Sequence, residues 1–420
     1  MRRTTILFVA VFLMQFGGSA GGTGLPLMAK FSFDASVWTL ALIGMVQSLM
    51  YAVSCLAIGS LVGKVRPLNA AMVGAALQGV TFVVAMFSRN SWDLFFVSAA
   101  GGVGQALFWP MIEGVISEGS DGARLNRRIG FFNVSWSAAD AGGTAAAGVL
   151  FKWSAWLPFA TMGVAMASTI VVVRMACRRG VDGLEALPPR FEQEALPTEG
   201  GKEINGRFRK AAWVGNFIAS GATNIVRSIF AAPAKDVFRM SSPMIGLALA
   251  MMSILRTVTF AGLREWPGWH YSGRVFMAFN TLLAIGLVGV VAAVFLPTGA
   301  AVALVFVSFS AIGVGIGMTY YSSIFYAVDT EAVATATARL HEAILGAGAA
   351  LAVLVAGGAD RFIAAGAQVS PAGAATPFAL SAAIVAGGMA LSGRYIRGNG
   401  SRNVLELETE KQYSEGANRG

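Results

Sequence analysis

The chain has 420 residues, of which 55% are hydrophobic and only 13% carry a charge, with a mean hydropathy of +0.64. Soluble globular proteins carry about 25% charged residues, so this composition excludes a soluble protein and indicates an integral membrane protein. The net charge of +9 forms no solvated basic face, which argues against nucleic-acid binding and fits basic loops beside a membrane.

Apolar runs of about 20 residues, long enough to cross the hydrocarbon core of a bilayer, recur along the whole chain. They predict twelve transmembrane helices, over residues 5–28, 37–62, 67–88, 92–117, 129–151, 155–176, 211–231, 242–263, 275–296, 300–326, 339–359 and 374–393. The longest polar break divides these spans six to six. The predicted organisation is an N-terminal bundle (1–176), a cytoplasmic linker (177–210), a C-terminal bundle (211–395) and a disordered cytoplasmic tail (396–420).

The first apolar run follows Arg2 and Arg3 and has small residues near Ala20, so it also resembles a signal peptide, whose removal would leave eleven spans. The loop charges decide between the two interpretations. With the first run retained and the N-terminus inside, most of the 31 Lys and Arg residues fall in cytoplasmic segments. This distribution predicts a multi-pass protein of the plasma (inner) membrane with both termini in the cytoplasm.

In the fourth span, Trp109 and Glu113 are four residues apart and share one helical face, with Pro110 between them as a predicted kink. An aromatic ring and a carboxylate facing one cavity suit a cationic or hydroxylated substrate. Alternatively, Glu113 pairs with a nearby arginine, such as Arg128, at the cytoplasmic gate, which is the interpretation we favour.

In the fifth span, Asp140 lies close to the predicted membrane midplane. A charged group there is costly and is a functional candidate by default. Changing surroundings would let such a carboxyl take up and release a proton. The structural alternative is a cap on a helix kink or a permanent pair with one arginine. Asn133 and Trp136 of the same span are candidates for lining a cavity.

Two arginines fall inside the predicted spans of the second half. Arg227 lies in the outer half of the seventh span, and its planar guanidinium suits a carboxylate or phosphate group of a substrate. Arg227 is equally well interpreted as a counter-ion of Asp140 or as a side chain that extends to the outer surface. Arg256 lies nearer the cytoplasmic end of the eighth span, where such extension is easier.

Tyr320 and Tyr321 belong to the most polar part of the tenth span, where a tyrosine either lines a cavity or anchors the helix at the membrane interface. The eleventh span opens with His341 and Glu342, which are predicted to gate the protein or relay protons, or else to pair with Arg339. With only two histidines, and with Cys55 and Cys177 far apart in apolar runs, we expect no metal site, no disulfide and no cofactor.

The fifth span, RRIGFFNVSWSAADAGGTAAAGVLF, has a counterpart in the eleventh, ARLHEAILGAGAALAVLVAGGADRF. Each is an arginine followed by a helix rich in Gly and Ala, at equivalent places in the two halves. Twelve spans, a basic central loop and a parallel repeat resemble the major facilitator superfamily. The resemblance implies an all-α membrane fold of two pseudo-symmetric six-helix bundles.

The motifs of this family are only partly present. Between the second and third spans, Gly59, Leu61 and Lys64 match the family signature, whereas Gly63 replaces its aspartate and Arg66 its second glycine. The resemblance assigns Lys64 and Arg66 to the cytoplasmic gate. In the fifth span, Gly142, Gly143 and Gly148 resemble a glycine-rich motif that the family associates with antiporters.

The resemblance implies a monomeric secondary transporter that moves a small organic solute through the lipid bilayer by alternating access. Intramembrane carboxyls and a histidine favour protons as the coupling ion. One alternative is a binding or sensing protein that has kept the fold without transport, and another is an exporter of amphipathic drugs. No phosphate-binding loop, HExxH motif or catalytic triad is present, so the sequence predicts neither an ATPase nor another enzyme.

Overall fold

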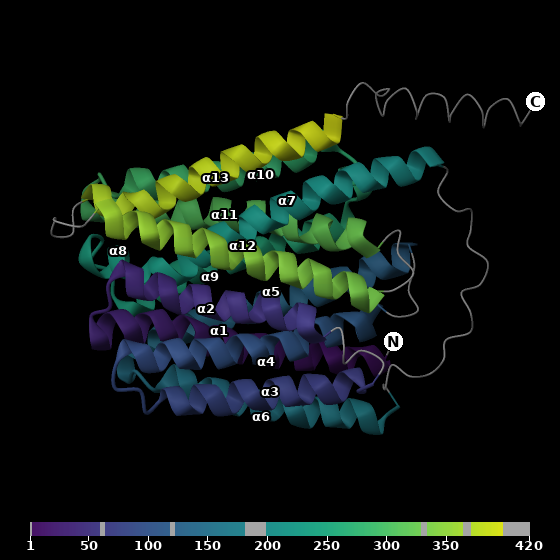
Figure 1. Cartoon of the computed structure of the whole chain (residues 1–420), viewed down its shortest axis with the longest axis horizontal. Helices are drawn as coiled ribbons and strands as arrows, with labels where there is room; N and C mark the ends of the chain where they lie inside the picture. The colour runs from purple at the N-terminus through teal and green to yellow at the C-terminus, as the bar shows by residue number, and fades with distance from the viewer. Residues whose placement is uncertain are drawn as a thin grey trace, which may run out of the picture.

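The computed structural model describes residues 2–58, 64–117, 122–180, 199–328, 334–363 and 371–397. Long helices run roughly along one axis and form two groups, purple to blue and teal to yellow in Figure 1. The first half contains α1 (Arg2–Phe33), α2 (Val37–Ala57), α3 (Pro67–Ala85), α4 (Ser91–Ser117), α5 (Gly122–Trp153) and α6 (Leu157–Arg178). The second contains α7 (Glu199–Ile229), α8 (Ala231–Asp236), α9 (Ser242–Glu265), η2 (Pro267–Trp269), α10 (Gly273–Ala293), α11 (Thr298–Val328), α12 (Ala334–Ile363) and α13 (Pro371–Arg397).

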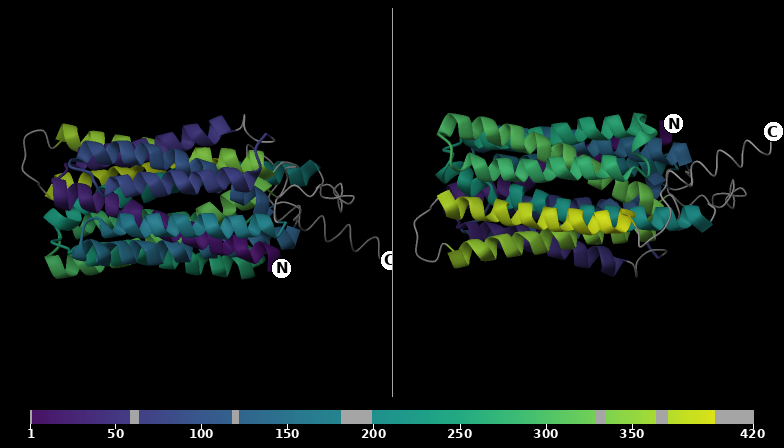
Figure 2. Two further views of the ribbon diagram at one scale, coloured as in Figure 1. Left: turned by 90° about the horizontal axis from the view of Figure 1, so that it is seen from below. Right: turned by 90° about the horizontal axis from the view of Figure 1, so that it is seen from above.

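The helix α1 begins, and α13 ends, at the same end of the bundle (Figure 2). We call this end the terminal face and the opposite end the distal face. The short helix α8, which hydropathy did not predict, follows α7 at the distal face. It places Lys235 and Asp236 next to the last turn of α1.

Ten helices in the described part of the chain are long and apolar enough to cross a membrane. The helices α5 and α7, which the sequence also predicts to span, fail that criterion although they contain 32 and 31 residues. Both begin with charged turns and carry polar side chains further along. These polar groups are tolerated because both helices pack at the centre of the bundle, where the groups find partners away from lipid.

The predicted linker, residues 177–210, overlaps helices at both of its ends. The helix α6 extends to Arg178, and α7 begins at Glu199. Residues 181–198 of the linker lie outside the described residues, as do 59–63 of the family signature and 398–420 of the predicted tail.

Two helix pairs make the main contacts between the halves, α5 with α9 and α2 with α12. Small residues let the backbones approach closely. A Cβ atom on Gly148 of α5 would lie 2.4 Å from the Ser242 carbonyl oxygen and 2.9 Å from Gly246 Cα of α9. On the other side, a Cβ on Gly346 of α12 would lie 3.0 Å from the Ser48 carbonyl oxygen of α2. A cavity lies between these two contacts.

Candidate functional site

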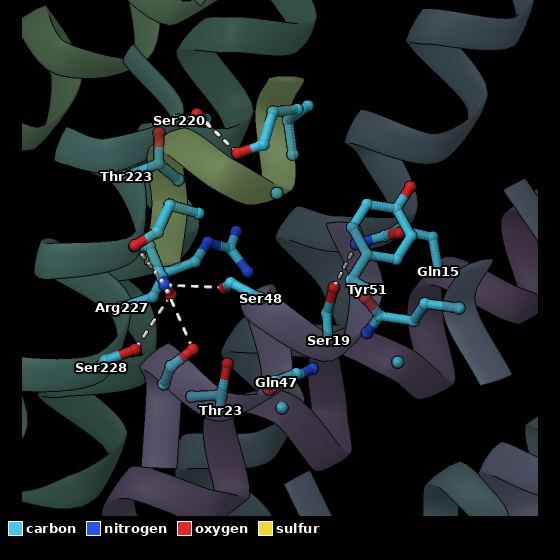
Figure 3. Close-up of a pocket in the computed structure, with 18 of the residues that line it drawn as sticks. Gln15, Ser19, Thr23, Gln47, Ser48, Tyr51, Ser220, Thr223, Arg227 and Ser228 are labelled. Carbon is cyan, nitrogen blue, oxygen red and sulfur yellow. Dashed lines mark hydrogen bonds between the residues drawn. The ribbon is translucent and has the colours of Figure 1, made fainter. Parts of the chain in front are cut away.

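The cavity has a volume of about 280 Å³ and is lined by both halves of the molecule. Amides and hydroxyls of α1 and α2 face Arg227 and the hydroxyls of α7 across it (Figure 3). Its aromatic wall is formed by Tyr51, Trp109, Trp136 and Tyr320. The cavity therefore combines polar side chains with a larger apolar surface, and its rings lie toward the terminal face.

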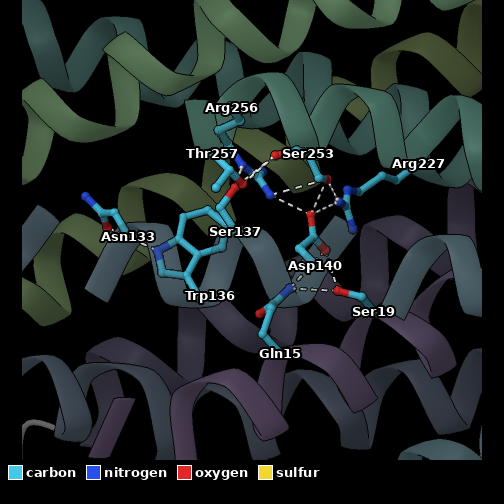
Figure 4. Close-up of polar contacts among 10 residues, drawn as sticks. All are labelled: Gln15, Ser19, Asn133, Trp136, Ser137, Asp140, Arg227, Ser253, Arg256 and Thr257. Atoms are coloured by element: carbon cyan, nitrogen blue, oxygen red, sulfur yellow. Dashed lines mark hydrogen bonds and ion pairs between the residues drawn. The ribbon is translucent and has the colours of Figure 1, made fainter. Parts of the chain in front are cut away.

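Beside the cavity, Asp140 of α5 is completely buried and accepts hydrogen bonds from five side chains (Figure 4). Gln15 and Ser19 of α1 donate to Oδ1, the former at 3.1 Å. Arg227, Arg256 and Ser253 of the other half donate to Oδ2. The ionised carboxylate thus joins the two halves through two ion pairs.

The sequence left open whether Arg227 binds substrate or neutralises Asp140. In the structure Arg227 pairs with Asp140 and uses only part of its guanidinium group to do so. Both hydrogen bonds of Arg227 to described residues use Nη2. The side chain is 26% exposed and lines the cavity, so Nε and Nη1 remain available on that side. Two arginines face one aspartate, and this cluster therefore carries one excess positive charge.

Arg256 is more deeply placed, with a side chain only 5% exposed. Its Nε donates to Ser137 Oγ at 2.9 Å, and its guanidinium lies 4.3 Å from the centroid of the Trp136 ring. It therefore does not extend to the cytoplasmic surface, which was one interpretation of its position in the sequence. Its contacts hold it against α5, where it also forms part of the cavity wall.

Trp136 connects this charged cluster to the terminal side of the cavity. Its ring meets that of Tyr320 edge to face, with 5.0 Å between the centroids. Its Nε1 donates to Asn133 Oδ1 at 3.1 Å, so Asn133 acts as a partner of the tryptophan and is not part of the cavity lining. Tyr321 also lies away from the cavity, packed against Phe260 and Trp269.

A second buried cluster lies around Tyr320. Its hydroxyl is 3.5 Å from Glu113 Oε1 of α4 and 3.5 Å from Glu342 Oε1 of α12. The Tyr51 hydroxyl donates to the other oxygen of Glu342. Next to it, His341 packs against the Tyr320 ring, and its Nδ1 lies 2.9 Å from Ser323 Oγ. Glu113 and Glu342 therefore have each other and two tyrosines as neighbours.

The basic residues predicted to form the gate do not meet these glutamates. In the described part of the chain, no Lys or Arg nitrogen lies within 4.0 Å of either carboxyl group. Arg128 donates to the Ile116 carbonyl oxygen at 3.4 Å, and Arg339 has a buried Nε without a hydrogen-bond partner. Lys64 is exposed, and Arg66 lines a separate groove between α3 and α6. Pairing of Glu113 with Arg128, the interpretation that the sequence favoured, is therefore absent from this structure.

Several functional candidates escaped the sequence interpretation. Ser19 and Ser253 are ordinary residues of apolar helices, although their spacing from Gln15 and Arg256 places them on the same helix faces. Gln78 of α3 and Asn216 of α7 line the cavity from opposite halves, buried and with amide nitrogens that have no partner in the described structure. A buried amide without a partner beside a cavity points to a ligand-binding role, and only the three-dimensional structure reveals it.

Comparisons with known proteins point in one direction. The family model described as "Major Facilitator Superfamily" matches residues 7–353. Two solved structures of a bacterial homolog to the human lysosomal transporter Spinster are similar in fold. The inward-facing, unoccupied form has a TM-score of 0.65 at 13% identity, and the inward-facing, occupied form has a TM-score of 0.61 at 14% identity. Each match covers 94% of this chain and 96% of the other. No curated protein sequence matches the chain.

Proposed function

Because the chain belongs to the major facilitator superfamily, we propose that it is a secondary active transporter of a small hydrophilic organic anion. Transport proceeds by alternating access, in which the two halves rock about the cavity between them. Protons are the coupling ion. One chain supplies every helix around the cavity, so we expect the transporter to work as a monomer.

The observation that carries the proposal is the excess positive charge at Arg227. Asp140 neutralises only one of the two guanidinium groups that it contacts. A carboxylate or phosphate group in the cavity meets the remaining N–H groups of Arg227 in the planar arrangement that such anions accept. The aspartate accepts five hydrogen bonds and has no exposed surface, so it offers little to a cationic substrate.

The remaining cavity wall suits a substrate with hydroxyl groups. Gln78 and Asn216 belong to the cavity lining and have buried amide nitrogens without a partner in the described structure, which a bound hydroxyl or carbonyl would satisfy after a side-chain rotation toward the cavity. The volume of about 280 Å³ lies just below the usual range for small-molecule pockets, roughly 300–1,000 Å³. This size favours a compact metabolite over the large amphipathic compounds that a drug exporter carries.

We further propose that the terminal face is cytoplasmic and that the membrane is the inner membrane. The basic side chains of Arg66, Arg174, Arg178, Arg264 and Arg394 belong to helix ends or connections at that face. Cytoplasmic loops carry the excess of Lys and Arg in membrane proteins. Both termini are then cytoplasmic.

A thermal-shift screen of the purified, detergent-solubilised protein tests the substrate class. The probes are gluconate, glycerol 3-phosphate and benzoate as anions, and tetraphenylphosphonium as an amphipathic cation. A ligand that binds only the folded state raises the melting temperature. We expect stabilisation by a hydroxylated anion, loss of this effect in Arg227→Ala and in Arg227→Lys, and its retention in Arg89→Ala, where the arginine is exposed at the distal face.

Counterflow of the stabilising anion in proteoliposomes then separates a transporter from a binding or sensing protein, since only a transporter exchanges ligand across the membrane. A pH gradient should drive accumulation. Stabilisation by tetraphenylphosphonium alone, unchanged in the Arg227 variants, would overturn the anion proposal and favour the drug exporter.

A further inference from the structure

Two glutamates, one from each half, meet on the terminal side of the cavity. Glu113 of α4 is 7% exposed and Glu342 of α12 is 3% exposed. The Tyr320 hydroxyl is 3.5 Å from an oxygen of each carboxyl group, so the two glutamates flank one hydroxyl. The cluster therefore crosses the boundary between the halves, at a place where little of either carboxyl group is exposed and where Glu342 and Tyr320 border the cavity.

Two carboxyl groups around one hydroxyl favour an additional proton. An ionised carboxylate only accepts hydrogen bonds, so two ionised groups have no proton to place between them. Two like charges at short range with little exposure to water also repel strongly, and such pairs hold one shared proton. Tyr51 donates to Glu342 Oε2, and Tyr320 has a single hydroxyl proton for two carboxyl groups. The geometry thus fits one proton shared by the glutamates.

Several titratable groups surround the pair, but no Lys or Arg nitrogen of the described residues lies within 4.0 Å of either carboxyl group. Tyr51 and Cys55 face the pair from α2, Tyr320 from α11, and His341 and Arg339 belong to α12. His341 Nε2 is 4.0 Å from Glu342 Oε1 and makes no hydrogen bond in the described structure. Arg256 of α9 pairs with Asp140 and lies against the Trp136 ring, which separates it from Tyr320.

Asp140, the carboxyl group that the sequence singled out for proton coupling, has surroundings unlike those of the two glutamates. It has two arginine counter-ions and five donors, so a proton on it would displace hydrogen bonds that already exist. The glutamate pair has a place for a proton, and Asp140 does not.

We infer that Glu113 and Glu342 bind the coupling proton between them and act as a clasp that closes the cytoplasmic face. This inference rests on the proposed transport function. On release, the shared O–H bond breaks, the proton passes to water on the cytoplasmic side, and two carboxylates remain. Their repulsion separates α4 from α12, and this face of the cavity opens. Uptake of one proton restores the hydrogen bond and closes it.

The clasp is physically connected to the anion site. Tyr320 contacts both glutamates and the Trp136 ring, and the opposite neighbour of Trp136 is the Arg256 guanidinium, which holds Asp140. Movement of α4 away from α12 disturbs Tyr320 first and the charged cluster next. Proton release and anion binding therefore act on one set of packed side chains.

Spin-label distance measurements on the purified full-length protein test the clasp without any transported ligand. Cys55→Ala and Cys177→Ser remove the native thiols, and labels at Val65→Cys and Arg394→Cys report the separation of the two halves at the terminal face, where both positions are exposed. We expect the distance to lengthen between mildly acidic and mildly alkaline buffer. In Glu113→Gln and Glu342→Gln the amide donates to the remaining carboxylate, so the short distance should persist at both pH values.

Glu203→Gln, at an exposed position of α7, is the matched control and should respond to pH like the parent protein. Glu342→Asp keeps a titrating group and should retain the response with a shifted midpoint, which separates loss of the proton from loss of folding. Infrared spectra provide a second readout. The carbonyl band of a protonated carboxyl group should disappear with rising pH in the parent and be missing in Glu113→Gln.

An inter-label distance that does not change with pH in the parent, or a pH response that persists in both glutamine variants, would overturn the inference. Neither outcome bears on anion binding at Arg227. Conversely, if no anion stabilises the protein in the ligand screen, the pH-driven opening can still be measured. The proposal of anion transport and the inference about the glutamates can therefore fail independently.

Discussion

Lys30 of α1 and Asp236 of α8 join the two halves at the distal face, with 2.8 Å between Nζ and Oδ2. Lys30 is only 7% exposed, and its Nζ also lies 3.0 Å from Oδ1 of Asp34. Lys235 of α8 approaches the same Asp34 oxygen at 3.5 Å. Two lysines and two aspartates thus alternate across the boundary, and their attraction stabilises closure of the distal face.

Asp236→Asn should open the distal face more than Asp34→Asn does. The Asp236 side chain is 23% exposed and that of Asp34 is 80% exposed. Removing the partner of a buried charge costs about 1–3 kcal/mol, whereas an exposed ion pair contributes about 0–1 kcal/mol. A membrane-impermeant maleimide added from outside to Thr23→Cys, a cavity position, measures the opening in a background without native cysteines. Equal labelling rates in the two variants would show that the distal contact is not held by Lys30 and Asp236.

Acid should weaken the same contact. The hydrogen bond and charge of Lys30, with the charge of Lys235, lower the pKa of the Asp34 carboxyl below its usual value of 3.8. A group with a lowered pKa stabilises the folded state above its usual value, and this contribution is lost as the pH falls through the lowered one. Below about pH 4 the melting temperature should therefore fall more steeply for the parent than for Asp34→Asn. Parallel curves for the two proteins would contradict this.

Asp140→Asn should destabilise the protein strongly, and a second substitution should restore part of the loss. The single change leaves Arg256, 5% exposed, without a counter-ion, and such a change typically costs about 3–5 kcal/mol. Asp140→Asn with Arg256→Gln removes both charges and should melt at a higher temperature than Asp140→Asn alone. Asp360→Asn, a partly exposed position of α12, serves as the control. Additive effects of the two substitutions would mean that the ion pair does not couple them.

Gly148→Ala should reduce stability while Gly142→Ala in the same helix is tolerated. The new Cβ at Gly148 would lie 2.4 Å from the Ser242 carbonyl oxygen, a backbone atom that cannot give way without moving α9. At Gly142 the nearest atoms belong to the Phe16 ring, at 3.4 and 3.5 Å, which is ordinary contact. Melting temperatures of the two purified variants decide the matter. A similar small change in both would show that α5 and α9 have room to separate.

Hydropathy predicted an all-helical membrane protein, and the resemblance carried by the repeat and the central loop implied the major facilitator fold; the family match and the structure confirm both. Charged residues inside apolar runs also directed attention to Asp140, Arg227 and Arg256, because isolated charges are rare in membrane helices. The structure brings these three together. Their serine partners were not predictable, since serine in a membrane helix commonly bonds to its own backbone.

The glutamate pair shows why the rest of the site escaped prediction. From the sequence, the expected ion-pair partners of Glu113 were the arginines that follow it in the chain, and the expected partner of Glu342 was Arg339. The Tyr51 hydroxyl that donates to Glu342 comes from a residue 291 positions away. Helical periodicity says which residues share a face, and it contains no information about which helices of the two halves meet.

The packing of α5 against α9 also limits how the halves move. The two helices touch near the terminal face at Gly130 and Arg264, in the middle at Ser137 and Ser253, and near the distal face at Gly148 and Gly246. At the last of these, bare backbone meets bare backbone, with no side chains to change rotamer as one helix turns on the other. The two helices can therefore turn on each other at this end of their contact without repacking side chains. A rotation about this contact separates α2 from α12, on the far side of the cavity.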